Sequence, residues 1–146
     1  MEKRINIGQL EPLAYKALMG LETYLAATTL SKTHKELIKI RASQINGCAF
    51  CINMHTADAR KHGETEQRIY LLNAWKEVAD LFTEEERAIL ALTEEMTLIA
   101  NGGVSDETYN KVKSLFDENQ LAQIMIAIIA INKYQAAVPV NRFRLD

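Results

Sequence analysis

The stretch from residue 36 to residue 63 reads ELIKIRASQINGCAFCINMHTADARKHG and carries most of the residues with distinctive chemistry. It contains both cysteines of the chain, Cys48 and Cys51, and two of its three histidines. Asn46-Gly47 is a turn signal, Gly63 is a helix stop signal, and few strong helix breakers lie between them. The sequence therefore predicts a helix that begins at or just before the first cysteine and ends near that last glycine.

Three reactive side chains share one face of this predicted helix. Cys48, Cys51 and His55 are spaced by three and four residues, which places them within about 60° of one another. Free amide donors and the positive end of the dipole at a helix N-terminus favour a thiolate there. His55, four residues after Cys51, can act as a base or proton shuttle for that sulfur. The helix dipole alone favours Cys48 as the more acidic thiol, whereas His55 favours Cys51. Helix geometry therefore does not decide which of the two cysteines is the nucleophile.

Glu36 belongs to a preceding helix, predicted over residues 32–45 and capped by Ser31. If the chain reverses at the Asn-Gly turn, Glu36 lies opposite roughly residue 57 and therefore close to His55. A carboxylate there would orient the imidazole and stabilise its charged form. This geometry predicts a relay from Glu36 through His55 to a cysteine. The alternative interpretation is a surface carboxylate among neighbouring lysines.

The composition fits one soluble domain, so we predict a single domain over residues 1–146. Of the 146 residues, 48% are apolar and 25% are charged, with a formal net charge of −2. Interspersed charges argue against nucleic acid or a membrane surface as partner. The N-terminus lacks the apolar core of a signal peptide, and the longest apolar run, 121–131, is shorter than the ~20 residues that span a bilayer. We therefore expect a cytoplasmic protein, in which paired cysteines are usually catalytic or metal-binding.

Apolar spacings of three and four recur along the chain, and strand signals are weak. The sequence predicts an all-α fold, a compact domain of about six to seven helices with the Cys-x-x-Cys at a helix N-terminus. The helices are expected at about 11–29, 32–45, 48–62, 65–79, 84–101, 106–116 and 118–138. Their expected caps include Ser31, a Thr83 to Glu86 capping box, Ser105, and Asp117 or Asn119, and Pro139 is expected to stop the last helix.

Some individual side chains are expected on particular faces of these helices. The first helix is expected to bury a stripe of six residues: Leu10, Leu13, Ala17, Leu21, Tyr24 and Leu25. The fifth is expected to bury Ile89, Leu92, Met96 and Ile99. Trp75 is expected in the core, His34 in solvent, and His62 at a helix C-terminus. The last helix is apolar nearly all round, which predicts that subunit packing covers part of it in a homo-oligomer.

The pattern Glu-x11-Cys-x2-Cys-x3-His in this setting resembles the alkylhydroperoxidase D branch of the carboxymuconolactone decarboxylase-like superfamily. The resemblance is close over residues 36–76 and looser over 84–100. It implies an all-α fold, a homo-oligomer (trimer or hexamer), and thiol peroxidase or disulfide reductase chemistry. The substrate it implies is a hydroperoxide, with a dithiol or protein reductant as partner and no cofactor.

Carried over residue by residue, the resemblance implies that Cys51 attacks the peroxide and that Cys48 is the resolving thiol. It implies Glu36 and His55 as the proton relay. Members of this branch with peroxidase activity place a histidine just before the second cysteine, where this chain has Phe50. That departure affects the expected efficiency of the proton relay. A second function is therefore open, namely thiol–disulfide exchange without significant peroxidase activity.

Two other interpretations of the cysteine pair are open. Free cysteines are often ordinary buried core residues. Cys48, Cys51 and His55 could also supply three metal ligands, with Glu36 or His62 as a fourth, although a structural zinc site usually draws on a second cluster that the sequence lacks. A non-catalytic metal-binding or interaction module on the same fold is therefore the alternative to a redox enzyme.

Overall fold

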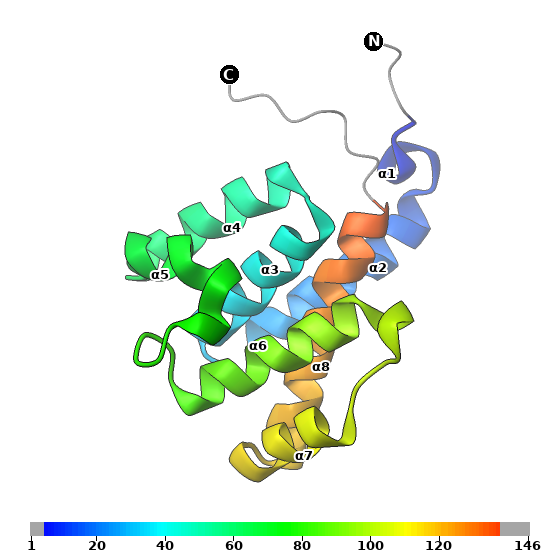
Figure 1. Cartoon of the computed structure of the whole chain (residues 1–146). Coiled ribbons are helices and arrows are strands. Elements are labelled where there is room, and N and C mark those ends of the chain that lie inside the picture. Colours follow the sequence, from blue (N-terminus) through cyan, green and yellow to red (C-terminus); the bar gives the residue numbers. More distant parts are fainter. Residues whose placement is uncertain (1–4, 138–146) are drawn as a thin grey trace.

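The computed structural model describes residues 5–137, and every regular element within them is helical, which confirms the all-α prediction. The elements are α1 (Ile7–Leu10), α2 (Pro12–Ala27), α3 (Lys32–Asn46), α4 (Ala49–Lys61), α5 (Glu66–Leu71), the 3-10 helix η1 (Leu72–Glu77), α6 (Glu84–Thr97), the 3-10 helix η2 (Ile99–Asn101), α7 (Asp106–Leu115) and α8 (Glu118–Ala137). Helices α3, α6 and α8 pack together at the centre, with α4 against α3, α2 against α8, and α7 against both α6 and α8 (Figure 1).

The apolar core consists of two clusters that share α3 and α6. The larger cluster lies among α2, α3, α6, α7 and α8 and contains Ile89 and Leu92. The smaller cluster lies among α3, α4, η1 and α6 and contains Leu90 and Trp75. The three α6 residues are completely buried, and burial of each such side chain stabilises the fold by about 1.5–3 kcal/mol. Because both clusters contain residues of α3 and α6, these two helices connect the cysteine-bearing helix α4 to the rest of the molecule.

The predicted helix starts are confirmed by side-chain caps. Ser31 accepts a hydrogen bond from the backbone N–H of His34, and Ser105 accepts one from Thr108. Thr83 and Glu86 form the complete capping box at the start of α6. Asp117, rather than Asn119, caps α8 through a 2.8 Å bond from the backbone N–H of Gln120. Pro139, the predicted stop of α8, lies outside the described residues.

The single helix predicted over 65–79 is wrong. The α-helix ends at Leu71 and continues as η1, with Ala74 in a non-helical conformation. The guanidinium of Arg87 donates to the backbone carbonyls of Trp75 and Val78 at 3.0 and 2.8 Å. A side chain from α6 therefore holds these two carbonyls, and the sequence of residues 65–79 does not indicate this contact. Trp75 itself is buried, as predicted.

The apolar stripe predicted for the first helix is only partly correct. Leu25 is buried, whereas Leu10, Leu13 and Tyr24 are 62%, 83% and 45% exposed. The reason is the position of α2 at the edge of the molecule, where it contacts α8 and the short α1. Ile99 is likewise 62% exposed, because α6 ends at Thr97 and Ile99 belongs to η2.

One further expectation needs correction. The side chain of His34 is only 15% exposed and packs edge-on against the ring of Phe116, so it is not solvated. Burial lowers the pKa of His34 and outweighs the opposing effect of Glu86 and Glu85. Helix α8 is covered mainly by α2, α3, α6 and α7 of its own chain, which leaves Ile129 48% exposed. Contacts within one chain do not test the predicted subunit packing against α8, which stays a prediction.

Candidate active site

The turn between α3 and α4 fixes the position of the cysteine pair. Gly47 has a positive φ of 64°, and its N–H bonds to the carbonyl of Gln44. The N–H of Cys48 bonds to the carbonyl of Ser43 at 3.0 Å, which completes a Schellman motif. A side chain at position 47 would strain this left-handed conformation, so glycine is required there. The motif ends α3 and delivers Cys48 directly to the start of α4.

Cys48 is the N-cap of α4, and its sulfur accepts the backbone N–H of Cys51 at 3.4 Å. The two cysteines form a disulfide with their Cα atoms 5.3 Å apart. Cys48 is 6% exposed and Cys51 is 2% exposed, so both sulfurs belong to the protein interior. The pair thus lies at the helix N-terminus, as predicted, and the amide donor there reaches Cys48.

His55 and Glu36 meet between α4 and α3. The Nδ1 atom of His55 lies 3.1 Å from Oε2 of Glu36, and both residues are buried. This is the contact that the helix reversal at the Asn-Gly turn predicts. The structure thereby brings all four candidate residues, Cys48, Cys51, His55 and Glu36, onto the facing sides of two adjacent helices. Phe50 lies on the outer part of α4, where it is 37% exposed.

Lys39 and Glu22 extend this group, and the sequence interpretation did not include them. The Nζ atom of Lys39 lies 3.7 Å from Oε1 of Glu36 and 3.5 Å from Oε2 of Glu22. The side chain of Lys39 is only 14% exposed. The spacing of three residues between Glu36 and Lys39 on one helix could have predicted the first contact. Nothing in the local sequence indicates the second, which depends on how α2 crosses α3.

A cavity of about 410 Å³ opens onto Cys48 and not onto Cys51. Its other walls are uncharged residues: Asn46, Gly47, Asn132, Gln135 and Ala136. The side-chain amide of Asn46 donates to Asn132 at 2.8 Å and to Gln135, which in turn donates to the hydroxyl of Ser43 at 2.7 Å. This amide network attaches the turn to α8 and holds the wall of the cavity in place.

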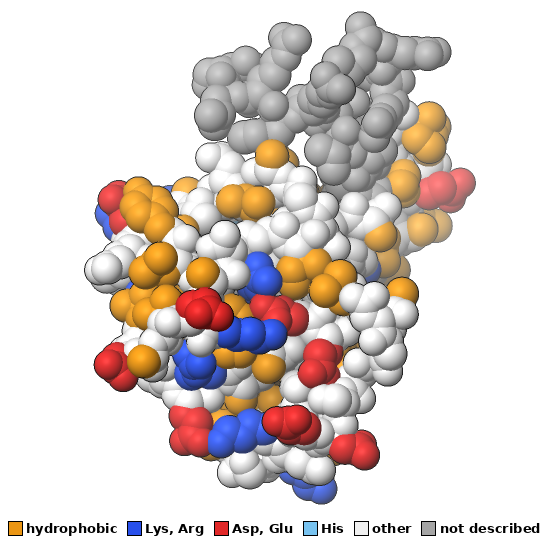
Figure 2. Space-filling view, in the orientation of Figure 1, with side chains coloured by type: hydrophobic (Ala, Val, Ile, Leu, Met, Phe, Trp, Pro, Cys, Tyr) orange, Lys and Arg blue, Asp and Glu red, His pale blue; other side chains and the backbone are white. Residues whose placement is uncertain are grey.

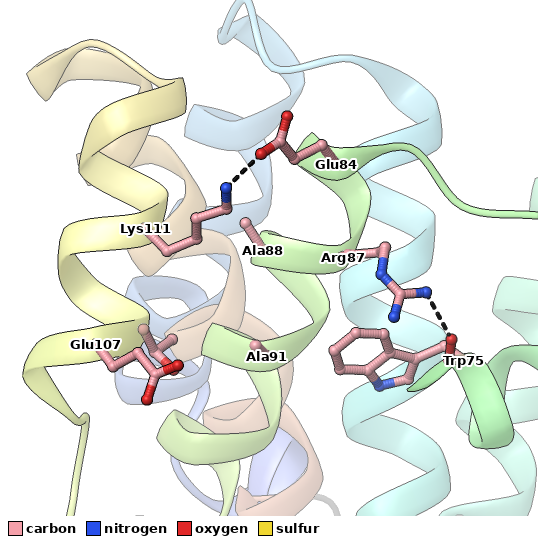
Figure 3. Close-up of a pocket in the computed structure, with 8 residues that line it drawn as sticks. Trp75, Glu84, Arg87, Ala88, Ala91, Glu107 and Lys111 are labelled. Carbon is pink, nitrogen blue, oxygen red and sulfur yellow. Dashed lines mark hydrogen bonds and ion pairs between the residues drawn. The ribbon is translucent and has the colours of Figure 1, made fainter. Parts of the chain in front are cut away.

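A second cavity, of about 220 Å³, lies between η1, α6 and α7 (Figure 3). Three of its four charged lining residues are already engaged: Lys111 pairs with Glu84, and Arg87 caps carbonyls of the η1 segment, while Glu107 is the fourth. Trp75 in its wall donates from its indole N–H to Glu94 at 2.7 Å. These contacts join α6 to η1 and α7, so the polar side chains around this cavity stabilise helix packing.

The surface of the molecule carries charges of both signs. Acidic and basic side chains are interspersed over the lower half of the face in Figure 2. No helix within residues 5–137 is both long and apolar enough to cross a bilayer. In the same residues no group of three or more His, Cys, Asp and Glu side chains is arranged to hold a metal ion. His62, proposed as a fourth ligand, is exposed at the C-terminal end of α4.

Comparison with known proteins assigns the family. The family model of the carboxymuconolactone decarboxylase family matches residues 12–95, which include α2 to η1 and most of α6, and therefore all four candidate residues of the cysteine site. The chain belongs to this family. Within it, the chain is 47% identical over 134 residues to the uncharacterized protein YdfG of Bacillus subtilis, covering 92% of this chain and 90% of that protein.

Solved structures of the carboxymuconolactone decarboxylase fold agree with the one described above. A protein of unknown function from Agrobacterium tumefaciens, provisionally assigned to the antioxidant defence protein AhpD, has a TM-score of 0.85 at 40% identity. The match covers 92% of this chain and 91% of that one. The debrominase Bmp8, solved with 2,3,4-tribromopyrrole, has a TM-score of 0.75 at 19% identity and covers 88% and 70% of the two chains, which shows the fold alone. The helical arrangement of this chain therefore recurs in other solved proteins.

Proposed function

We propose that this chain is a thiol-dependent peroxidase and disulfide oxidoreductase that uses Cys51 and Cys48 as its redox pair. The observation that carries the proposal is the buried contact between Glu36 and His55 on the helix face that also bears the cysteines. A structural disulfide needs no such neighbours. A histidine that accepts and returns protons works best when a partner fixes its ring orientation. The AhpD assignment of the similar Agrobacterium structure supports the same chemistry.

In the reduced protein His55 accepts the proton of Cys51 through Nε2, because Nδ1 is engaged by Glu36. The Cys51 thiolate attacks the distal oxygen of a hydroperoxide, the O–O bond breaks, and the leaving alkoxide receives the proton as an alcohol. Cys51 is then a sulfenic acid. The sulfur of Cys48 attacks it, which forms the disulfide and releases water. One hydroperoxide is reduced for each dithiol oxidised.

A dithiol donor returns the pair to its reduced state by exchange. A donor thiolate attacks Cys48, because that residue lines the 410 Å³ cavity. Cys51 leaves as a thiolate and receives a proton from His55. The second donor thiol then displaces Cys48, and the donor departs as a disulfide. In this scheme Cys51 exchanges protons with His55, and Cys48 reacts with the dithiol donor at the cavity.

A second candidate is thiol–disulfide exchange without significant peroxidase activity. Phe50 favours it, because it occupies the position where peroxidase-active relatives of the resembling branch carry a histidine. In this case the cavity, the cysteine pair and His55 have the same roles, and the oxidant is a disulfide rather than a hydroperoxide. In either case we propose one domain over residues 1–146, acting as a homo-oligomer in the cytoplasm.

Intact mass measurement after one equivalent of an organic hydroperoxide tests the proposal. The reduced parent is expected to lose two hydrogens rapidly, and Cys48→Ser is expected to gain one oxygen. Cys51→Ser, as the matched control, should do neither at a comparable rate. Oxidation by a small disulfide but not by the hydroperoxide would establish the second candidate. Resistance to both oxidants would contradict redox function altogether.

A further inference from the structure

A line of three side chains of alternating charge runs from the buried histidine to the side of the molecule formed by α2. The order is His55 on α4, Glu36 and Lys39 on α3, and Glu22 on α2. Successive pairs are separated by 3.1, 3.7 and 3.5 Å. Exposure of the side chains rises along the last part of this line, from 11% and 14% at Glu36 and Lys39 to 30% at Glu22. The site is therefore electrostatically connected to a helix that contributes none of the four candidate residues.

Lys39 is the cation on which this arrangement depends. Glu36 is buried, and its oxygens face His55 on one side and Lys39 on the other. A buried carboxylate needs compensation by charge or hydrogen bonds, and a neutral imidazole supplies only one hydrogen bond. Lys39 supplies the opposite charge, and Glu22 holds its ammonium group in place from the other side.

We propose that Lys39 is a positioning residue that sets how easily the thiol and the imidazole of this site lose their protons, and that Glu22 attenuates its effect. The inference rests on the proposed redox function of the Cys51–His55 pair. A nearby cation favours loss of a proton from either group, and a nearby carboxylate opposes it. Lys39 and Glu22 therefore act on the same equilibrium with opposite signs.

Several other charged groups lie near this line. Lys32 on α3, His62 at the end of α4 and Glu64 just after it line a small cavity together with Glu36. On α3, Lys35 interacts electrostatically with both Glu36 and Lys39, but its ammonium donates to the backbone carbonyl of Leu25 at 2.5 Å. On α8, Lys133 and Tyr134 interact electrostatically with Glu22. Within residues 5–137 none of these groups forms an ion pair or hydrogen bond with Glu36, whereas Lys39 lies directly against it. Lys39 is therefore the residue to change.

The test measures alkylation of Cys51 by iodoacetamide as a function of pH in the Cys48→Ser background. Lys39→Met should move the pH of half-maximal rate upward by roughly 0.5 units, and Glu22→Gln should move it downward. Lys39→Arg keeps the charge and should leave the midpoint near that of the parent. Lys113→Met, which changes an exposed lysine on α7, is the control for altered net charge.

Opposite shifts in Lys39→Met and Glu22→Gln cannot come from general damage to the fold, and circular dichroism checks that each variant is folded. If Lys39→Met does not fold, the Glu22→Gln and Lys39→Arg variants still decide the question. Unchanged midpoints, or shifts of the same sign, would overturn the inference. Alkylation needs no hydroperoxide, so a parent that fails to react with hydroperoxide would contradict the proposed peroxidase and leave this result interpretable.

Discussion

The Nδ1 atom of His55 lies 3.1 Å from Oε2 of Glu36, and this contact joins the two helices that flank the cysteine turn. The side chains are 8% and 11% exposed. Such a contact fixes the ring of the histidine and determines which nitrogen remains for chemistry. Under the proposed function, Nε2 is the atom that exchanges protons with Cys51.

His55→Gln should therefore slow the oxidation of Cys51 by roughly 100-fold or more, which is the usual contribution of a positioned acid–base group. The measurement is the rate of sulfenic acid formation in the Cys48→Ser background at constant pH. His62→Gln is the matched control, because His62 is exposed at the end of the same helix. Equal rates in the two histidine variants would contradict the role of His55.

Glu36→Gln should also slow oxidation, but by less, on the order of 10-fold, because the amide still forms a hydrogen bond without the charge. In the His55→Gln background the same change should have little further effect, since Glu36 acts through the histidine. The double-mutant cycle on oxidation rates measures this coupling. Independent, multiplicative effects would show that Glu36 has a separate role.

Glu94 should make the stability of the protein sensitive to acid. Burial raises the pKa of Glu94, but hydrogen bonds from Lys76, Trp75 and Arg41 more than offset it, so the net pKa is lower than its ordinary value of 4.5. Its stabilising contribution is therefore present above about pH 4.5 and is lost as the pH falls through the folded-state pKa.

Glu94→Gln should lower the free energy of unfolding by about 2 kcal/mol at pH 7 and by much less at pH 3. Urea unfolding at both pH values provides the comparison. Glu77→Gln, at an exposed glutamate, should change neither value. An equal loss at both pH values would exclude the charge of Glu94 as the cause.

Lys133 should destabilise the fold. Among the described residues its Nζ atom is buried without a hydrogen-bond partner. Burial lowers the pKa of Lys133 below its ordinary value of 10.5, although Glu22 opposes this. The charged form is thus penalised in the folded state, and stability should rise as the pH increases through the folded-state pKa toward 10.5.

Lys133→Met should raise the free energy of unfolding at pH 7 by about 1 kcal/mol, because it removes an unpaired buried amine and keeps most of the apolar side chain. The alkaline increase in stability should disappear at the same time. Denaturant unfolding at pH 7 and pH 10 measures both effects. A loss of stability in this variant would contradict the prediction.

The proposed homo-oligomer should depend on α1 and α2. Leu10 and Leu13 are 62% and 83% exposed there, which is unusual for neighbouring leucines unless another surface covers them. Light scattering of the parent is expected to give the mass of a trimer or hexamer. Leu13→Glu should shift it toward smaller species, whereas Lys113→Glu on α7 should not. A monomeric parent at about 10 μM would refute the prediction.

The local sequence predicted much of the site because its parts are close together in the chain. The Asn46-Gly47 turn, the N-terminal position of Cys48 and the shared face of Cys51 and His55 follow from backbone preferences and helix periodicity. The contact with Glu36 also follows, since two helices joined by a tight turn must run back along each other. Caps such as Ser31 and Thr83 are likewise local, and the structure confirms them.

Predictions failed where partners are distant in sequence. The helix predicted over 65–79 is interrupted because Arg87 on another helix binds its carbonyls. Leu13 matches a buried stripe by spacing, yet α2 lies at the edge of the molecule. His34 has polar neighbours in sequence but packs against Phe116. Spacing defines the faces of a helix, but only its neighbours decide which face is buried.

The sequence by itself therefore determined an all-α protein and a reactive face on which two cysteines and a histidine coincide, because helix geometry is a property of the local chain. Only the tertiary structure decided that Lys39 lies between Glu36 and Glu22, and that the amide-lined cavity reaches Cys48. Both features depend on where α2 and α8 cross α3. Crossing is set by the packing of side chains from distant segments, which no local pattern contains.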